Sequence, residues 1–213
     1  MLKELVSYIF PITRKVRSSF SGDLEINLIN GRKVLDSKST NYSFGSLQRI
    51  LKYALEQIDL NTKNEILLLG LGGGSVVETL RNDLIYSGSI TAIEIDRAVI
   101  TIADKEFGIT SDEKTHIMCE DAFAYIEQTD KPFDLIIIDL FIDDRMPEQC
   151  FTTHFWKKIL KSTGKRGNII FNTLNDRRSD TMAILEKLEQ NGMNCRMFRN
   201  LESTNDVLIC GYA

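Results

Sequence analysis

The chain has 213 residues, of which 43% are hydrophobic and 26% charged, and this balance excludes an intrinsically disordered chain and predicts one principal globular domain. Its formal net charge of -4 gives no overall basic surface, so we do not expect an extended nucleic-acid interface. A small or cationic partner fits this charge better.

The cysteines are widely spaced and include no CxxC pair, so they indicate neither a zinc knuckle nor a disulfide scaffold. We interpret them as reduced and mostly buried. The two histidines have no partner at metal-ligand spacing, and we expect no metal site. The four cysteines are Cys119, Cys150, Cys195 and Cys210.

The amino-terminal residues do not have the pattern of an export signal. Residues 1–10 contain apolar side chains, but they also carry Lys3 and Glu4, and no small-residue cleavage site follows them. No stretch is long and apolar enough to predict a transmembrane helix. We therefore expect a cytoplasmic protein with no membrane partner.

The first predicted element is a β-hairpin over residues 22–36. Apolar and polar residues alternate from Leu24 to Leu28, and Asn30-Gly31 follows, which is a strong signal for a two-residue turn. Apolar residues then recur at helical spacing over residues 44–58. We assign residues 1–60 to a hairpin and linking helix, and 61–213 to the main domain. Because open strand edges are usually covered, we expect a homodimer that uses the hairpin.

From residue 65 onward, short apolar runs alternate with amphipathic segments, which is typical of parallel strands covered by helices on both faces. Five βα units and a terminal strand pair predict an α/β fold, a doubly wound seven-stranded Rossmann-like sheet. A ligand of such a sheet binds at the carboxyl ends of the strands. The predicted strands are residues 66–71, 90–95, 116–119, 135–140, 168–171, 194–198 and 206–212.

The first of these strands runs into a glycine-rich turn containing Gly70, Gly72 and Gly74. Ser75 and Glu78 have the spacing of a capping box, so we place the glycines between strand and helix, where a ligand can approach the backbone. A tight turn without a ligand is the alternative, but it needs only one or two glycines. Ser75 stands where a dinucleotide fingerprint has its third glycine, so we favour a nucleoside without pyrophosphate.

Two carboxylates end the next two strands. Glu94 lies 20 residues after Gly74, where an acid accepts hydrogen bonds from both ribose hydroxyls, although an ordinary strand-end carboxylate is the alternative. Asp121 could accept a hydrogen bond from the exocyclic amine of adenine or could cap the following helix. Together the glycine turn and the two acids describe a pocket of the S-adenosylmethionine type.

With these residues in this order, the chain resembles the spermidine synthase-like branch of the class I S-adenosylmethionine-dependent methyltransferase superfamily. Residues 66–75, 93–100 and 120–123 resemble the first three motifs of that family, and residues 134–143 resemble the strand that carries its catalytic aspartate. The resemblance implies a class I fold with an amino-terminal β-hairpin extension.

The resemblance also implies roles for particular residues. It assigns Gly70, Gly72, Gly74 and the pair Asp121-Ala122 to donor binding, together with Glu94 at the ribose. It places Asp139 at the reacting centre, where a carboxylate would hold and deprotonate an amine. A strand-end aspartate that only bonds nearby backbone N–H groups is the alternative for Asp139.

Three departures from the family weaken a polyamine assignment. Gly73 stands where the family has an aspartate that binds the aminopropyl end of decarboxylated S-adenosylmethionine. Ser46-Leu47 replaces a Tyr-Gln pair, and Ile142 replaces a second aspartate. A bound diamine needs such acids to offset the desolvation of its charges.

We therefore predict a transferase with S-adenosylmethionine or its decarboxylated form as donor, with methyl transfer favoured and a small-molecule acceptor of unknown identity, for which an amine is one candidate. The alternatives are a polyamine aminopropyltransferase with a non-standard acceptor pocket and a non-catalytic nucleoside-binding protein. Asp143, Asp144 and Glu148 are the alternative acids if Asp139 is not catalytic.

Overall fold

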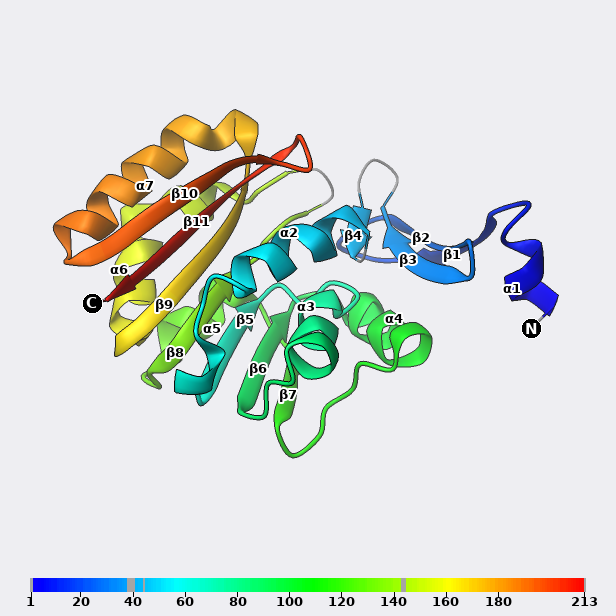
Figure 1. Cartoon of the computed structure of the whole chain (residues 1–213), viewed down its shortest axis with the longest axis horizontal. Helices are drawn as coiled ribbons and strands as arrows, with labels where there is room; N and C mark the ends of the chain where they lie inside the picture. Colours follow the sequence, from blue (N-terminus) through cyan, green and yellow to red (C-terminus); the bar gives the residue numbers. More distant parts are fainter. Residues whose placement is uncertain (1, 38–40, 44, 143–144, 213) are drawn as a thin grey trace.

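The computed structural model describes residues 2–37, 41–43, 45–142 and 145–212, which form two β-sheets (Figure 1). The smaller sheet is antiparallel with the strand order β1-β2-β3-β4, and α1 precedes it. The predicted hairpin is confirmed as β2 and β3, and β1 and β4 extend it on either side. The bounds are α1 Leu2–Val6, β1 Ile12–Arg17, β2 Asp23–Ile29, β3 Arg32–Asp36 and β4 Asn41–Ser43.

The turn between β2 and β3 and one polar contact explain how the small sheet is built and held. Asn30 and Gly31 have φ of 50° and 73°, as the two-residue hairpin turn requires. Asp96, which is 1% exposed, accepts hydrogen bonds from the hydroxyls of Ser18 and Ser21 in the β1–β2 turn. The small sheet is therefore tied to the main domain at the start of α4.

The larger sheet has seven strands in the order β10-β11-β9-β8-β5-β6-β7, as predicted for the doubly wound fold. Strands β5 to β9 are parallel, and β11 pairs antiparallel with β9 and β10. The chain order reverses between β5 and β8, which is the switch point where such sheets bind ligands. The strands are β5 Glu65–Leu69, β6 Ser89–Glu94, β7 Thr115–Cys119, β8 Phe133–Ile138, β9 Thr163–Leu174, β10 Met193–Leu201 and β11 Asn205–Tyr212.

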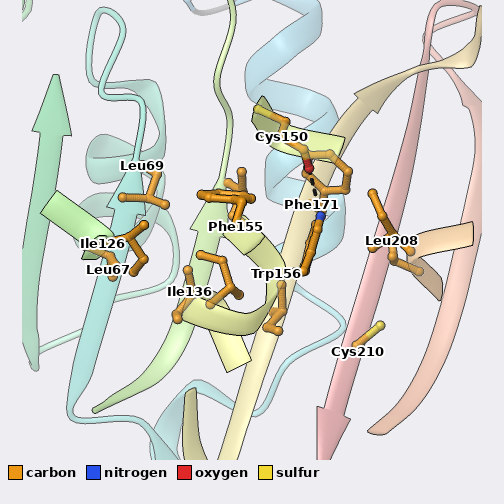
Figure 2. Packing of buried hydrophobic residues seen from close by; sticks show 14 of the residues in the cluster. Leu67, Leu69, Ile126, Ile136, Cys150, Phe155, Trp156, Phe171, Leu208 and Cys210 are labelled. Atoms are coloured by element: carbon orange, nitrogen blue, oxygen red, sulfur yellow. Dashed lines mark hydrogen bonds between the residues drawn. The ribbon is translucent and has the colours of Figure 1, made fainter. Parts of the chain in front are cut away.

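Helices cover both faces of this sheet. On one face, α5, α6 and α7 pack over Leu67, Ile136 and Phe171, and the buried Trp156 donates a hydrogen bond from its indole N–H to the carbonyl of Cys150 at 2.8 Å (Figure 2). On the other face lie α2, α3 and α4. The helical segments are α2 Ser46–Leu55, η1 Leu60–Thr62, α3 Ser75–Glu78, η2 Thr79–Asp83, α4 Arg97–Phe107, α5 Ala122–Gln128, η3 Glu148–Phe151, α6 Thr153–Ser162, η4 Asn175–Arg177 and α7 Arg178–Gln190.

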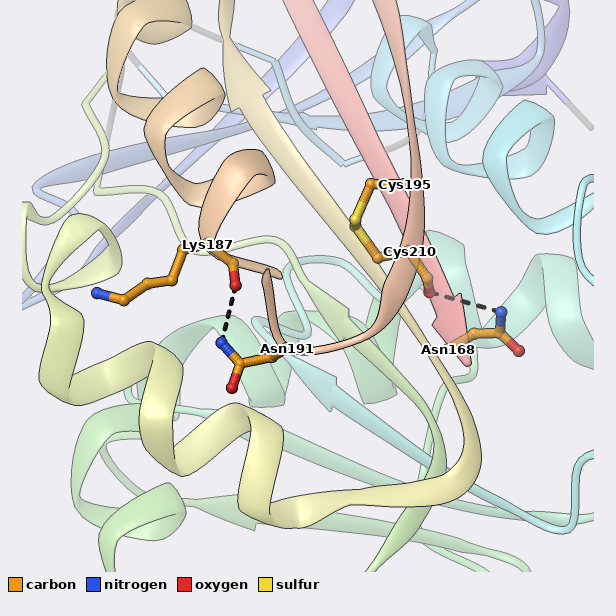
Figure 3. Close-up of a disulfide and its surroundings, with 5 residues drawn as sticks. All are labelled: Asn168, Lys187, Asn191, Cys195 and Cys210. Carbon is orange, nitrogen blue, oxygen red and sulfur yellow. Dashed lines mark hydrogen bonds between the residues drawn. A yellow bond between two sulfur atoms is a disulfide. The ribbon is translucent and has the colours of Figure 1, made fainter. Parts of the chain in front are cut away.

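The interpretation of the cysteines as reduced is wrong for two of the four. Cys195 on β10 and Cys210 on β11 form a disulfide, because the antiparallel register places them directly opposite each other, with their Cα atoms 4.2 Å apart (Figure 3). Cys119 is exposed, and Cys150 is free and buried as expected. Sequence spacing alone did not reveal the pairing, because it depends on the register of the β10–β11 hairpin.

Within the part of the chain that the structure describes, no helix is long and apolar enough to cross a membrane. The proposed dimer remains a prediction that rests on the open edges of the small sheet.

Candidate functional site

A cavity of about 490 Å³ opens at the carboxyl ends of the parallel strands, next to the switch point between β5 and β8. Its size lies in the usual range for small-molecule sites. The strand ends, α2 and the β10–β11 turn all contribute to its wall. The lining residues are Ser46, Leu47, Ile50, Gly70, Gly72, Ile93, Glu94, Ile95, Asp121, Ala122, Phe123, Asp139, Leu140, Phe141, Ile142, Pro147, Leu174, Glu202, Thr204 and Asn205.

The glycine turn borders the cavity, and its backbone conformation also favours glycine. Gly70, Gly72 and Gly74 have φ of 95°, 55° and 90°, which favours glycine at all three positions. Gly70 and Gly72 line the cavity, whereas Gly74 packs beside Ile109 and does not line it. The predicted capping box is wrong, because Gly74 occupies the N-cap and Ser75 is the first residue of α3.

Gly70→Ala is expected to destabilise the fold by on the order of 3 kcal/mol, because a Cβ there would lie 2.1 Å from the carbonyl oxygen of Asp139 at a strained φ. Urea denaturation would measure the loss. Gly108→Ala is the matched control, since its φ is 69° but no atom lies within 4 Å of an added Cβ, and it should cost only about 1 kcal/mol. Equal losses in the two variants would contradict the close approach of the turn to β8.

Glu94 is buried, with 6% of the residue exposed, at the end of β6. Its Oε2 accepts a hydrogen bond from the backbone N–H of Gly72 at 3.1 Å, and its Oε1 accepts one from Asp96 at 3.0 Å. Burial raises the pKa of Glu94 to about 7, although these backbone bonds act in the opposite direction. The carboxylate therefore braces the glycine turn and faces the cavity.

Asp121 is the N-cap of α5, as one of its two predicted roles required. Its Oδ1 accepts hydrogen bonds from the backbone N–H groups of Phe123 and Ala124 at 2.7 and 3.0 Å. The residue also lines the cavity together with Ala122. Because both bonds use Oδ1, a role of Oδ2 in binding a nucleobase is compatible with the cap and stays a prediction.

Asp139 follows β8 and lines the cavity. Its backbone N–H donates to the carbonyl of Leu69 at 2.8 Å, and its Oδ1 accepts a hydrogen bond from Nδ2 of Asn172 at 2.8 Å. The residue keeps some solvent contact through the cavity, but protein atoms surround the carboxylate, and this burial raises the pKa of Asp139 to about 6. The Asp139 carboxylate therefore bonds a side-chain amide, whereas the alternative role in the sequence analysis involved bonds to backbone N–H groups only.

Sequence reasoning missed the residues that reach the cavity from outside the βα units. Glu202 and Thr204 come from the β10–β11 turn, Asn205 begins β11, and α2 contributes Ile50 besides the Ser46-Leu47 pair that the sequence already indicated. The Arg49 guanidinium on α2 makes two hydrogen bonds to the Glu202 carboxylate, at 2.9 and 2.7 Å, and so links the two walls. No sequence motif marks the residues of this turn. The turn is distant in sequence from the strand ends, and the pairing of β11 with the rest of the sheet brings it to the cavity.

The lining is acidic and, towards β8 and α2, apolar. Glu94, Asp121, Asp139 and Glu202 are carboxylates, and the described residues that line the cavity include no lysine or arginine. Such a wall favours a cationic ligand. Among residues whose placement is described, no group of three or more His, Cys, Asp or Glu could hold a metal ion.

Two of the departures from the family pattern lie in the cavity wall, namely the Ser46-Leu47 pair and Ile142. Gly73 is absent from the lining residues that the structure describes. Asp143 and Asp144 lie outside the described residues. Glu148 is exposed and bonds the guanidinium of Arg177. It is not among the described residues that line the cavity.

Residues 47–201 match the family described as the spermine/spermidine synthase domain. The chain belongs to this family. The resemblance deduced from the motifs is therefore confirmed. Within the spermine/spermidine synthase domain lie the glycine turn and all three predicted acids, whereas β1 to β4 precede it.

Two kinds of curated relative share this domain. A polyamine aminopropyltransferase from Vibrio vulnificus is 30% identical over 127 residues, which are 58% of this chain and 42% of that protein. An eEF1A lysine and N-terminal methyltransferase homolog from Drosophila pseudoobscura pseudoobscura is 27% identical over 170 residues, which are 75% of this chain and 25% of that protein. The chain thus spans less than half the length of either relative.

Solved structures show the same fold. A probable spermidine synthase from Corynebacterium glutamicum has a TM-score of 0.67 at 18% identity, with 95% of this chain and 77% of that chain covered. Human methyltransferase-like protein 13, solved in complex with SAH, has a TM-score of 0.64 at 20% identity, with 80% and 83% covered. The class I methyltransferase fold is therefore shared with proteins named for both reactions.

Proposed function

We propose that this chain binds S-adenosylmethionine in the cavity and transfers its methyl group to a small acceptor that carries an amine. The observation that carries the proposal is the wall itself, in which three strand-end carboxylates face one cavity while Leu47 and Ile142 occupy positions where the resemblance implies polyamine-binding residues. An aminopropyl acceptor with two charges would meet apolar side chains there, and their contact would not offset its desolvation.

The residues present fit the donor. Glu94 would accept hydrogen bonds from the ribose hydroxyls, and Asp121 would accept one from the adenine amine through Oδ2. Gly70 and Gly72 leave the backbone bare beside the sugar and sulfur. Because carboxylates dominate the wall, the positive sulfonium gains from the field of the site.

Methyl transfer needs positioning and the removal of one proton. The lone pair of the acceptor nitrogen forms the new C–N bond as the bond from carbon to sulfur breaks, and that electron pair stays on sulfur as a neutral thioether. An amine is mostly protonated near neutral pH and then has no free lone pair, so one proton must leave the nitrogen before this attack. Asp139 would hold the amine in line with the methyl carbon and accept that proton, and its raised pKa of about 6 suits this role near neutral pH.

Calorimetric titration with S-adenosylmethionine, its decarboxylated form and methylthioadenosine tests the proposal. Because Gly73 lacks the carboxylate that the resemblance places at the aminopropyl end, S-adenosylmethionine is expected to bind at least as tightly as the decarboxylated donor. Turnover would be followed as S-adenosylhomocysteine released with a panel of amines, thiols and alcohols. A clear preference for the decarboxylated donor would refute methyl transfer.

A polyamine aminopropyltransferase is the second candidate, and a specific observation favours it. Asp139 matches the catalytic aspartate of the family and lies in the cavity, and curated relatives with this domain are named polyamine aminopropyltransferases. Formation of a longer polyamine from putrescine and decarboxylated S-adenosylmethionine would establish this activity. Binding of nucleosides without turnover would instead identify a non-catalytic nucleoside-binding protein.

A further inference from the structure

We infer that Asn172, itself oriented by Asn205, is a positioning residue that fixes the Asp139 carboxylate toward the acceptor side of the cavity. The inference rests on the proposed function, because it assigns Asn172 and Asn205 to the residue that holds the acceptor. Neither asparagine contacts the reacting atoms in this scheme. Both act through Asp139.

Three strands bring the network together. Asn172 on β9 is 0% exposed and donates from Nδ2 to Oδ1 of Asp139 at 2.8 Å. Its own Oδ1 accepts from Nδ2 of Asn205 on β11 at 2.9 Å. The register explains the approach, since Phe171 pairs with Ile138 on one side and Asn172 pairs with Val207 on the other.

The network has one consistent direction. Oδ1 of Asn205 accepts from the hydroxyl of Thr204 at 2.8 Å, which leaves the amide nitrogen of Asn205 to face Asn172. The carbonyl of Asn172 is thereby occupied, so its N–H group must face Asp139. Rotation of the Asn172 amide would bring two N–H groups together and a carbonyl against a carboxylate, in a site where unsatisfied polar groups are costly.

The network affects the orientation and the pKa of the Asp139 carboxylate. Because Asn172 occupies Oδ1, the carboxylate is held in one rotamer, and Oδ2 is the oxygen left for an acceptor among the bonds of the described residues. The bond also favours the ionised carboxylate and so opposes the effect of burial on the pKa of Asp139. In the described wall, the other ionisable side chains that share the cavity with Asp139 are Glu94, Asp121 and Glu202.

A structural role alone would not require Asn172 to be polar. Apolar side chains of similar volume at Asn172 and its polar neighbours together would avoid burying these groups, and replacement of all partners of a buried hydrogen bond is often close to neutral for stability. The amide is therefore best explained by the carboxylate that it bonds. Asn172 stands directly after an apolar run, as Glu94 and Asp139 do.

The test compares Asn172→Leu and Asn205→Leu with the control Asn168→Leu. Asn168 lies nearer the middle of the same strand, outside the described wall of the cavity, and its amide bonds the carbonyl of Cys210 at 3.5 Å (Figure 3). Carbon NMR of protein labelled at the aspartate carboxyl carbons would follow the titration of Asp139, and the signal would be assigned by its loss in Asp139→Asn. Calorimetry with S-adenosylmethionine and the pH profile of turnover complete the measurements.

Loss of the hydrogen bond in Asn172→Leu is expected to raise the pKa of Asp139 by about 1. Turnover should then fall roughly fivefold at about pH 6 and recover at alkaline pH, while donor affinity stays unchanged. Asn205→Leu frees the Asn172 amide to rotate and should shift the titration in the same direction but less. Asn168→Leu should leave both the titration and the profile unchanged.

The outcomes separate this inference from the proposed function. An Asp139 titration that is unchanged in folded Asn172→Leu overturns the positioning role, whether or not turnover is found. If Asn172→Leu does not fold, an unchanged titration in Asn205→Leu overturns it equally. A shifted titration in a protein that turns over no acceptor supports the coupling of Asn172 to Asp139 and refutes the transferase.

Discussion

Glu94→Ala is expected to weaken binding of S-adenosylmethionine by on the order of 2 to 4 kcal/mol, which corresponds to roughly 30-fold to nearly 1,000-fold. In the proposed binding mode, the variant would lose two charge-assisted hydrogen bonds to the ribose. It also removes the acceptor of the Gly72 N–H, so the glycine turn that borders the ligand loosens. Titration calorimetry at about pH 8, where Glu94 is ionised, measures the loss.

The pH dependence of donor binding provides a second measurement on Glu94. Its pKa is raised to about 7 in the free protein, so the carboxyl is largely protonated below that pH. Ribose hydroxyls and a positive sulfonium favour the ionised form, and donor affinity should therefore rise as the pH rises through about 7. The stability of the free protein is expected to show the opposite trend. Its folded state holds the Glu94 proton to higher pH than the unfolded chain, so the unfolding free energy should fall between the ordinary glutamate pKa of 4.5 and about 7.

Glu65→Ala is the matched control for Glu94→Ala. Glu65 is the first residue of the neighbouring strand β5, at the amino ends of the parallel strands and so away from the cavity, and it pairs with Lys131 at 2.8 Å on the surface. Its replacement should leave donor affinity and its pH dependence unchanged. Unchanged affinity in a stable Glu94→Ala protein would mean that the donor binds outside this cavity.

The seven-stranded sheet could be predicted because parallel strands covered on both faces must be apolar throughout. Residues 66–69 are all 0% exposed, and their run is visible in the sequence. Strand β9 begins before its predicted start at residue 168, because residues 163–167 belong to the strand but have no apolar pattern, and only Thr163 among them pairs with β8, opposite Phe133. Strand β1 was not predicted for the same reason. Four of its six residues are exposed, and its backbone bonds to β2 leave no signal in the side chains.

The site residues at the ends of strands could be predicted from the sequence. The residues whose positions depend on the pairing of distant strands could not. Glu94 and Asp139 stand at the end of or directly after an apolar run, Asp121 follows β7 after one intervening residue, and all three line one cavity. Asn172 also directly follows an apolar run, so the sequence pattern indicates it as well. Glu202 and Asn205 belong to an antiparallel hairpin whose register one sequence does not specify, and the Cys195–Cys210 pair was missed for that reason too.

Asp139→Asn is expected to lower turnover by roughly 10²-fold or more while keeping most of the donor affinity. Asparagine has the same shape, and its carbonyl oxygen can still accept the hydrogen bond from Asn172, so the fold and the cavity should remain. Its other polar group becomes an N–H donor, which neither attracts a cationic amine nor takes its proton. The loss should therefore appear in kcat and in acceptor KM, and not in calorimetry with S-adenosylmethionine.

Asp130→Asn is the control for this change, because Asp130 is exposed and pairs with Lys161 on the surface at 2.7 Å. It should turn over at the wild-type rate. If Asp139→Asn also turned over at that rate, proton removal would lie elsewhere. The acids to replace next would be Asp143 and Asp144, which lie beyond the described residues, ahead of Glu148, whose carboxylate is engaged by Arg177. A protein that binds the donor equally in both variants and turns over no amine, thiol or alcohol would be a nucleoside-binding protein, because only an enzyme requires the charge at Asp139.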